Sequence, residues 1–272
     1  MQYGAVSMVD AHGKYDVERW VGEGATASED MVAEEVPVAL VYNGFSHAVM
    51  MSTPQDLEDF ALGFTLSEGI VREAREVLDI EVVEHAQGSE VRMQITAERF
   101  ALMREKRRAM IGRTGCGICG VESLEQLACR PVGVVAASGT LETGALLRAQ
   151  RELQARQQLF ELTGAVHAAA WCRFDGSVAL VREDVGRHNA LDKLIGAVAA
   201  QSGAFSDGFL LMTSRASYEI VQKAAAVGIA VVAAVSAPTG MAVRLAQGAG
   251  LTLIGFARGE RHSVYSHPQR LH

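Results

Sequence analysis

Short runs of apolar residues alternate with polar ones between residues 36 and 95, which is the pattern of half-buried β-strands. Val38 to Tyr42 and Phe45 to Met51 flank Asn43-Gly44, a dipeptide that favours a tight hairpin turn. Ile80 to Val83 and Val91 to Ile95 have the same character. This part of the chain therefore predicts two strand pairs.

A helix is predicted between these strand pairs. Its apolar residues recur at i, i+3, i+4 and i+7 and are Leu57, Phe60, Ala61 and Phe64. Ser52 or Thr53 is its expected N-cap, with Pro54 suited to the first turn and Gly69 expected to end it. After the second strand pair, Glu98 to Arg108 predicts a short basic helix.

The second half of the chain predicts one long helix and another hairpin. Leu141 to Leu162 has helical spacing, and its expected apolar face consists of Leu146, Ala149, Leu153 and Phe160. Val166 to Phe174 and Ser177 to Val181 flank Asp175-Gly176, a second hairpin signal. A further helix follows, with apolar positions at Leu191, Leu194, Ile195 and Val198.

Three continuous apolar runs in the last third of the chain predict buried parallel strands. Phe209 to Met212, Ile229 to Val235 and Leu251 to Phe256 begin about twenty residues apart, with helical segments between them. The expected fold is a mixed α/β sheet covered by helices, with a smaller N-terminal α+β domain. The expected organisation is an extended arm at 1–33, the smaller domain at 34–110, a mobile loop at 111–120, the α/β domain at 121–265 and a tail at 266–272.

The composition narrows the class of ligand and the compartment. The 25 Lys and Arg against 32 Asp and Glu give a net charge of −7, so no general affinity for nucleic acid is expected, and an anionic ligand needs a local cationic site. Four unevenly placed cysteines do not form a secreted disulfide scaffold. No signal peptide and no membrane-spanning run is evident, and we expect a cytoplasmic protein.

Polar residues at the carboxyl ends of the predicted parallel strands indicate an anion site, because ligands of open α/β sheets bind at that edge. These residues are Thr213, Ser214, Arg215, Ser236 and the segment from Phe256 to Arg261. Arginine matches phosphate geometry, and Phe256 is suited to stacking on a base. The alternative is an ordinary solvated edge, and this pattern alone does not choose between the two. No P-loop is present, and no G-x-G-x-x-G motif follows a predicted strand.

Glu183 to Asn189 is a second dense polar stretch. It ends a predicted strand and opens a helix, where free backbone N–H groups favour anions. Arg187 and His188 are the candidate ligand-binding residues here. Asp184 and Asn189 have an equally good interpretation as turn and cap residues.

Gly112 to Gly120 carries the strongest chemical signal, a Cys116-x-x-Cys119 pair surrounded by glycines. Such a pair can bind zinc, cycle as a disulfide or carry sulfur. Zinc would need two more ligands, and Cys129 and Cys172 have no suitable spacing. The glycine loop weakens the redox interpretation. Nearby positive charges would favour a thiolate and hence sulfur transfer; they are Arg104, Lys106, Arg107, Arg108 and Arg113.

The chain resembles the formate dehydrogenase accessory proteins of the FdhD family over about residues 35 to 265. The resemblance rests on the segments Gly112–Gly120, Arg182–Lys193, Ser214–Glu219 and Gly255–Gly259. It implies a sulfurtransferase that receives sulfur from a cysteine desulfurase as a persulfide on Cys116, with Cys119 as the second thiol. The acceptor would be the bis-molybdopterin guanine dinucleotide cofactor, for which GDP is an analogue, before its insertion into formate dehydrogenase.

The same resemblance assigns cofactor binding to Phe256, Ala257, Arg258, Gly259, Glu260 and Arg261. Glu260 stands where the family commonly has Asp. It also implies a homodimer and a larger domain of the cytidine-deaminase type. The deaminase zinc signature is not met, because Ala168 and Ala169 follow His167, and no metal site is expected. A cofactor-binding chaperone, in which the cysteine pair is an interface or zinc element, is the alternative function.

Overall fold

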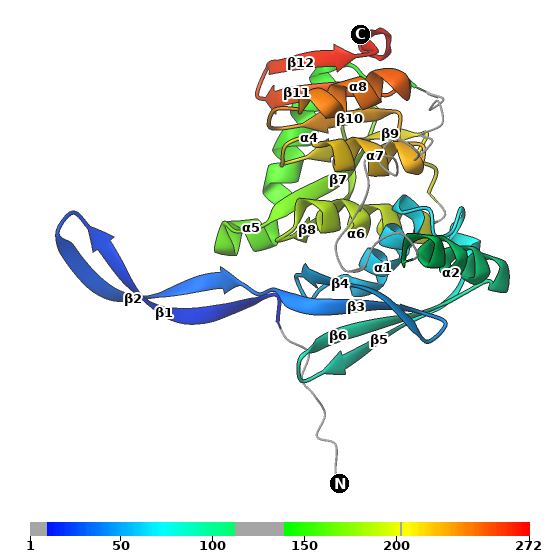
Figure 1. Ribbon diagram of the computed structural model, residues 1–272. Coiled ribbons are helices and arrows are strands. Elements are labelled where there is room, and N and C mark those ends of the chain that lie inside the picture. The colour runs from blue at the N-terminus through cyan, green and yellow to red at the C-terminus, as the bar shows by residue number, and fades with distance from the viewer. Residues whose placement is uncertain (1–9, 112–138, 202) are drawn as a thin grey trace.

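The computed structural model describes residues 10–111, 139–201 and 203–272. Figure 1 shows a large sheet with helices on both faces, a smaller sheet below it, and a two-stranded ribbon that projects away from the body. The mixed α/β class with a smaller N-terminal α+β part is therefore confirmed. The predicted boundary near the cysteine loop falls where the described residues stop.

The small sheet contains the two predicted strand pairs. Its strands are β3 (Val36–Tyr42), β4 (Phe45–Ser52), β5 (Val77–His85) and β6 (Gly88–Ile95), in the order β4-β3-β6-β5. β3 pairs antiparallel with β4 and parallel with β6. Alternate residues of β6 are buried, so one face of this sheet packs on the core, as the period-two pattern predicted.

Helix α1 (Leu57–Ser67) lies on this sheet, and its beginning differs from the prediction. Ser52 and Thr53 do not cap it, because their hydroxyls bind Asp184, 132 and 131 residues further along the chain. Its end is as predicted: Gly69 has a φ of +65°, and two bonds of a Schellman motif, Gly69 N to Leu66 O and Ile70 N to Thr65 O, are both 3.0 Å long. The short helix η1 (Ala74–Glu76) leads into β5, and α2 (Ala97–Ile111) follows β6.

The large sheet has six strands in the order β12-β11-β10-β9-β7-β8. The strands are β7 (His167–Arg173), β8 (Val178–Asp184), β9 (Gly208–Met212), β10 (Val231–Ala234), β11 (Thr252–Arg258) and β12 (Arg261–Ser266). β9, β10 and β11 are parallel, as their continuous apolar runs predicted, and all residues of β9 and β10 are buried. The hairpin at Asp175-Gly176 is also confirmed.

Helices cover both faces of this sheet. α6 (Arg187–Ala200), α7 (Tyr218–Ala226) and α8 (Gly240–Gly248) lie on one face and α4 (Thr143–Arg156) on the other (Figure 1). The single helix predicted for residues 141 to 162 is wrong. Its second half is a separate helix, α5 (Gln158–Thr163), and Phe160 is 46% exposed rather than on a buried face. The carboxylate of Glu183 accepts the backbone amides of Leu159 and Phe160, both at 2.9 Å, and so starts the new helix. Near the C-terminus, η2 spans Pro268–Arg270.

The N-terminal arm is a hairpin that the sequence pattern did not predict. β1 (His12–Val21) and β2 (Gly24–Ala33) pair antiparallel around Gly22, which has a φ of +62°. Trp20 and Val21, at the tip, are 63% and 82% exposed. Both faces of this ribbon carry polar residues, so the alternation of apolar and polar positions that marks a half-buried strand is absent. The turn residues alone were too weak a signal to predict the hairpin.

The two parts of the molecule meet where α1 packs on α6. A Cβ atom added to Gly63 of α1 would lie 1.7 Å from the carbonyl oxygen of Asp192, and one added to Gly196 of α6 would lie 1.9 Å from that of Asp59. Only glycine permits so close an approach of two backbones. The buried apolar residues form one continuous core across this contact, so α6 has a fixed position relative to both sheets. We refer to this contact and the polar side chains around it as the α1–α6 junction.

Candidate functional site

Four strands of the large sheet, β8, β9, β10 and β11, end at the same edge. β8 and β9 both run antiparallel to β7, and β9, β10 and β11 run parallel to one another. The edge therefore collects the residues that follow each strand: Arg187 and His188 after β8, Ser214 and Arg215 after β9, Ser236 after β10, and Phe256 to Arg261 at the end of β11. We call it the strand-end edge. The expected convergence of the segments after β9, β10 and β11 is confirmed at the level of the backbone, and the structure adds Arg187 and His188, which the sequence did not place at the same edge.

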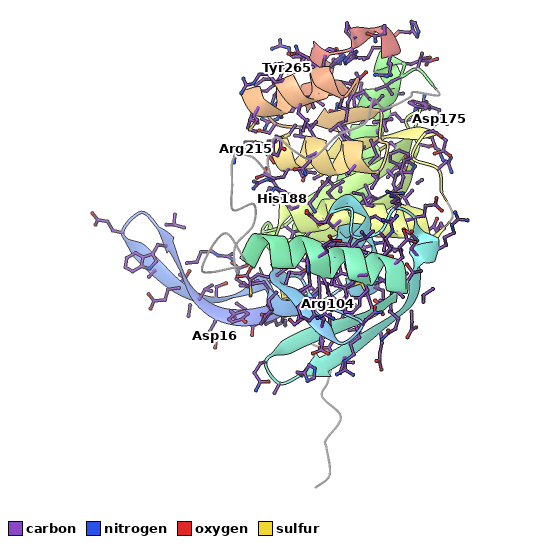
Figure 2. All side chains as sticks on the ribbon, turned by 45° about the vertical axis from the view of Figure 1, so that its right-hand side comes forward. Asp16, Arg104, Asp175, His188, Arg215 and Tyr265 are labelled. Atoms are coloured by element: carbon purple, nitrogen blue, oxygen red, sulfur yellow. The ribbon has the colours of Figure 1, made fainter. Side chains whose placement is uncertain are left out.

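The loops that cross this edge are tied to each other. The residue pair Ala216 and Pro238 forms an isolated bridge between the loops after β9 and β10, and Thr239 N donates to Ala216 O at 3.1 Å. Phe256 N donates to Ser236 O at 3.1 Å, which joins the end of β11 to the same loops. Figure 2 shows His188 and Arg215 on the same side of the molecule.

Helices α6 and α7 present their N-termini to this edge without side-chain caps. Gly186 and Ser217 occupy the N-cap positions. Glycine has no side chain to cap α6, and the Ser217 hydroxyl accepts no cap hydrogen bond at α7. By contrast, Thr239 caps α8 through a 3.3 Å bond from Ala242 N. Uncapped N-termini expose backbone N–H groups and the positive end of the helix dipole, which favour an anion.

Two polar atoms of the first turn of α6 are buried without a hydrogen-bond partner in the described part of the chain. They are Nε of Arg187 and Nε2 of His188. Glu219 Oε2 lies 3.7 Å from His188 Nε2, too far for a hydrogen bond. Since a buried polar group without a partner costs free energy, two such atoms beside a helix N-terminus indicate a place for a ligand.

The protonation states at this point follow from burial and local charge. Burial, followed by the neighbouring guanidinium of Arg187, lowers the pKa of His188, and the same two causes lower the pKa of His167. Burial alone would raise the pKa of Glu219, but a hydrogen bond from its own backbone amide and the nearby guanidinium of Arg187 hold it below the usual value. At neutral pH the edge therefore holds neutral imidazoles beside a permanent cation.

The candidate residues after β9 contribute unequally. Ser214 is buried, and its hydroxyl donates to the carbonyl of Arg215 at 3.1 Å, so it shapes the loop. Arg215 is exposed at the edge. Thr213 is likewise occupied, because its Oγ1 accepts Ala168 N at 2.9 Å and ties β9 to β7.

Phe256 has a left-handed backbone conformation, which is rare for an aromatic residue. Its φ is +52°, in the left-handed region, and the β11–β12 pairing has an extra residue on β11 between Gly255 and Arg258. Such a bulge turns a side chain out of the strand's regular alternation. The ring of Phe256 is 46% exposed while Ala257 is fully buried. Strain of this kind is kept where the surroundings enforce it, often at binding sites.

Later in the 256–261 segment, Gly259 and Glu260 form a tight turn between β11 and β12. Gly259 supplies a φ of +57° at its centre, and Glu260 is exposed beside it. Arg258 and Arg261 are directly opposite each other across the two strands, and Arg258 Nε donates to Val235 O at 2.9 Å. Like charges facing each other across a ladder destabilise it, so this pair is suited to an anion that neutralises both.

Most of the Arg182–Lys193 segment does not face the edge, which sequence reasoning missed. Arg182 binds Asp59 of α1, Glu183 starts α5, Asp184 pairs with Lys193, and Asp192 pairs with Lys223. Asp184, Asp192 and Lys193 are almost completely buried. Only Arg187 and His188 of this segment have the position that the anion hypothesis requires. The sequence did offer one signal, the i, i+4 spacing of ionisable residues in two helices. In α6 these are His188 and Asp192, and in α7 they are Glu219 and Lys223. His188 therefore faces Glu219, and Asp192 faces Lys223.

Cys116, Cys119 and Cys129 lie outside the described residues. Cys172 is fully buried in β7, and burial raises the pKa of its thiol far above the ordinary value. Within residues 10–111, 139–201 and 203–272, no three His, Cys, Asp or Glu side chains are grouped so that they could hold a metal ion. In the same described part, no helix is long and apolar enough to cross a membrane.

The fold and the strand-end edge define a mixed α/β protein that offers two uncapped helix N-termini, arginines and one exposed aromatic ring to an anionic ligand. The chain belongs to the FdhD/NarQ family, whose model matches residues 33–272. It is 56% identical over 260 residues to the sulfur carrier protein FdhD of Cupriavidus necator, covering 96% of this chain and 90% of that protein. The sulfur carrier protein FdhD of Xanthomonas euvesicatoria is 53% identical over 255 residues, covering 94% and 90%.

A solved structure shares the fold. The crystal structure of a protein from Desulfotalea psychrophila, described as a formate dehydrogenase accessory protein, superposes with a TM-score of 0.75. The alignment covers 96% of this chain and 100% of that chain, at 23% identity. At this identity the likeness establishes the architecture, while the family assignment rests on the sequence matches.

Proposed function

We propose that the chain is a sulfur carrier in the maturation of formate dehydrogenase, and that it acts as a sulfurtransferase through a persulfide on Cys116. The thiolate of Cys116 attacks the terminal sulfur of a persulfide on a cysteine desulfurase; a new S–S bond forms, and the donor cysteine leaves as a thiolate. The acceptor is the bis-molybdopterin guanine dinucleotide cofactor, bound as a substrate before it enters formate dehydrogenase. Family membership and the glycine-flanked cysteine pair support this assignment.

The observation that carries the cofactor site is the combination at the strand-end edge of guanidinium groups and free helix N-termini with an exposed aromatic ring. The uncapped starts of α6 and α7, Arg187 and the Arg258–Arg261 pair are suited to diphosphates. The ring of Phe256 is suited to stacking on guanine. A dinucleotide offers both kinds of group in one molecule, whereas an inorganic anion would leave the aromatic ring unused.

The persulfide is tested by mass spectrometry after incubation of the protein with a desulfurase and cysteine. We expect the peptide that contains Cys116 to become one sulfur atom heavier. Cys172 is the internal control, because its buried thiol of raised pKa should stay unmodified. Sulfur found on another cysteine, with Cys116 unmodified, contradicts the assignment.

The nucleotide site is tested by titrating the full chain with GDP. Phe256→Gly removes the ring and retains the backbone conformation, and we expect it to weaken GDP binding about tenfold or more, since stacking contributes roughly 1–3 kcal/mol. Phe160→Ala is a matched control, because Phe160 is also 46% exposed but lies on α5. Equal affinities for the two variants would exclude Phe256 from the site.

A cofactor-binding chaperone, in which the cysteine pair is an interface or zinc element, is the second candidate. It needs the same strand-end edge but no thiol chemistry. Cys116→Ala separates the two functions: we expect it to abolish the activation of formate dehydrogenase while GDP binding persists. Full activation by this variant favours the chaperone, and elemental analysis of the purified protein tests for zinc.

The assembly and the compartment complete the proposal. The chain is expected to meet the desulfurase and formate dehydrogenase in the cytoplasm, where thiols stay reduced. A homodimer is the expected assembly, and light scattering of the purified chain measures it. A monomer at micromolar concentration would contradict that expectation without affecting the persulfide assignment.

A further inference from the structure

A single buried carboxylate connects the N-terminal sheet to the strand-end edge. Oδ2 of Asp184 accepts hydrogen bonds from Ser52 Oγ at 2.6 Å, Thr53 N at 3.0 Å and Thr53 Oγ1 at 2.8 Å, all at the end of β4. Nζ of Lys193 lies 2.7 Å from the same oxygen. Asp184, Thr53 and Lys193 are completely buried. One oxygen of this carboxylate is thus saturated by the small domain and by α6.

The other oxygen of Asp184 holds the turn that opens α6. Oδ1 accepts Gly186 N at 2.7 Å and Asn189 Nδ2 at 3.1 Å. Asn189 Nδ2 also donates to the carbonyl of Met51 in β4 at 2.7 Å. Arg187 and His188 lie between these two anchoring residues, in the first turn of the helix. The path of the backbone that carries both groups is therefore fixed from two sides.

Thr53 completes the connection by binding both members of the ion pair. Its Oγ1 donates to Asp184 and accepts from Lys193 Nζ at 2.7 Å, and its carbonyl oxygen accepts a second bond from Lys193 at 3.0 Å. Removal of this one hydroxyl thus loosens the contact between the small domain and the turn, while the ion pair itself remains.

Stability alone does not account for this arrangement. Desolvation of two buried charges costs as much as their attraction returns, and well-packed apolar residues of the same volume are often as stable. A fully satisfied buried network does, however, select one geometry for the groups that it holds. Here those groups include the backbone before Arg187 and His188, whose side chains retain unpartnered atoms at the edge.

We propose that Asp184 is a positioning residue for the anion site, and that Thr53 places it there from the small domain. The small domain thereby sets the orientation of Arg187 and His188 at the strand-end edge, although it supplies no ligand-binding group of its own to the described site. The inference rests on the proposed function in one respect: it takes the start of α6 to be part of the cofactor site.

The test compares two buried threonines in the full-length protein. Thr53→Val keeps the volume and removes the hydroxyl, and we expect the dissociation constant for GDP to rise about fivefold to tenfold. Thr65→Val is the matched control, because Thr65 is also completely buried and its hydroxyl lies 2.8 Å from Tyr42 Oη, away from Asp184. Both variants should lose thermal stability, but only Thr53→Val should lose affinity. Thr53→Ser restores the hydroxyl and should restore the affinity.

The outcomes separate this inference from the proposed function. If the wild-type protein does not bind GDP, the cofactor site and the positioning role both fail. If it binds GDP and Thr53→Val binds equally well, the positioning role alone is wrong. Equal weakening by Thr53→Val and Thr65→Val would also overturn it, because the loss would then follow general destabilisation. Sulfur loading of Cys116 in Thr53→Val should match the wild type, since the proposed effect concerns nucleotide binding.

Discussion

The α1–α6 junction and the strand-end edge both use residues of α6, but their buried polar groups differ. Those of the junction are paired, whereas two at the edge have no partner among the described residues. At the junction, Lys193 lies 2.7 Å from Asp184, and Lys223 lies 2.9 Å from both Asp192 and Glu68. One turn earlier in α6, buried atoms of Arg187 and His188 lack partners among the described residues. The comparison shows that charge density in a sequence motif does not locate a binding site. Within this segment, the buried polar atoms that lack a partner mark the residues at the edge, and the satisfied ones mark the junction.

The largest effect should come from breaking the junction. Lys193→Met leaves the buried carboxylate of Asp184 without its counter-charge, and we expect a loss of about 3–5 kcal/mol in the free energy of unfolding. Chemical denaturation measures it. Lys14→Met is the control, because Lys14 forms an exposed ion pair with Glu29 at 3.5 Å and should leave the denaturation midpoint nearly unchanged. A small effect at Lys193 would mean that the junction tolerates an uncompensated charge.

A smaller effect should come from forcing the two helices apart without changing any charge. Gly63→Ala places a methyl group 1.7 Å from the Asp192 carbonyl oxygen, so α1 must shift away from α6. We expect a loss of about 1–3 kcal/mol in the free energy of unfolding. Gly144→Ala is the control: nothing lies within 4 Å of its added Cβ atom, and alanine in a helix should stabilise the protein by about 0.5–1 kcal/mol. Equal effects of Gly63→Ala and Gly144→Ala on the free energy of unfolding would contradict the close-packed junction.

The sequence predicted those elements whose apolar pattern decides their structure. The continuous apolar runs of β9, β10 and β11 predicted parallel strands, because a strand that is buried on both faces has apolar residues at nearly every position. The parallel strands in turn predicted the edge where ligands bind. Ser52 and Thr53 were assigned as helix caps because local rules see only neighbours in sequence. Their actual partner, Asp184, is more than 130 residues away. Long-range polar pairing of this kind leaves no periodic signal.

Only part of the candidate site could be predicted from the sequence, because local rules again consider only neighbouring residues. The strand-end arginines and Phe256 lie within or next to the last residues of predicted strands, so their place at the edge could be inferred. The left-handed backbone of Phe256 could not, because no turn rule places an aromatic residue there. In the polar stretch from Glu183 to Asn189, the sequence singled out Arg187 and His188 as ligand-binding candidates and left Asp184 and Asn189 with an alternative as turn and cap residues. The structure assigns Arg187 and His188 to the edge and most of the other polar residues to the junction or to the start of α5.

The smallest effect concerns the protonation of the edge. Because the folded state lowers the pKa of His188, the unfolded chain binds a proton more readily below the ordinary histidine pKa of about 6.5. The contribution of His188 to stability is therefore present above that pH and lost as the pH falls through the window between the unfolded and the folded pKa. His167 has a lowered pKa too and adds to the same trend. His188→Gln should flatten the dependence of the unfolding free energy on pH between about 7 and 5.

An anion bound beside the imidazole reverses the sign of this effect, because a negative charge raises the pKa of His188. At pH 6, GDP binding should therefore be accompanied by the uptake of up to about one proton per protein molecule. The affinity for GDP should be higher at pH 6 than at pH 8. Calorimetry in buffers of different ionisation enthalpy measures the uptake. His188→Gln should remove most of it, whereas His85→Gln, in the four-stranded sheet, should leave it unchanged. Proton uptake that survives in His188→Gln would place the anion away from the start of α6, and the contrast between the satisfied junction and the unsatisfied edge would no longer identify the binding site.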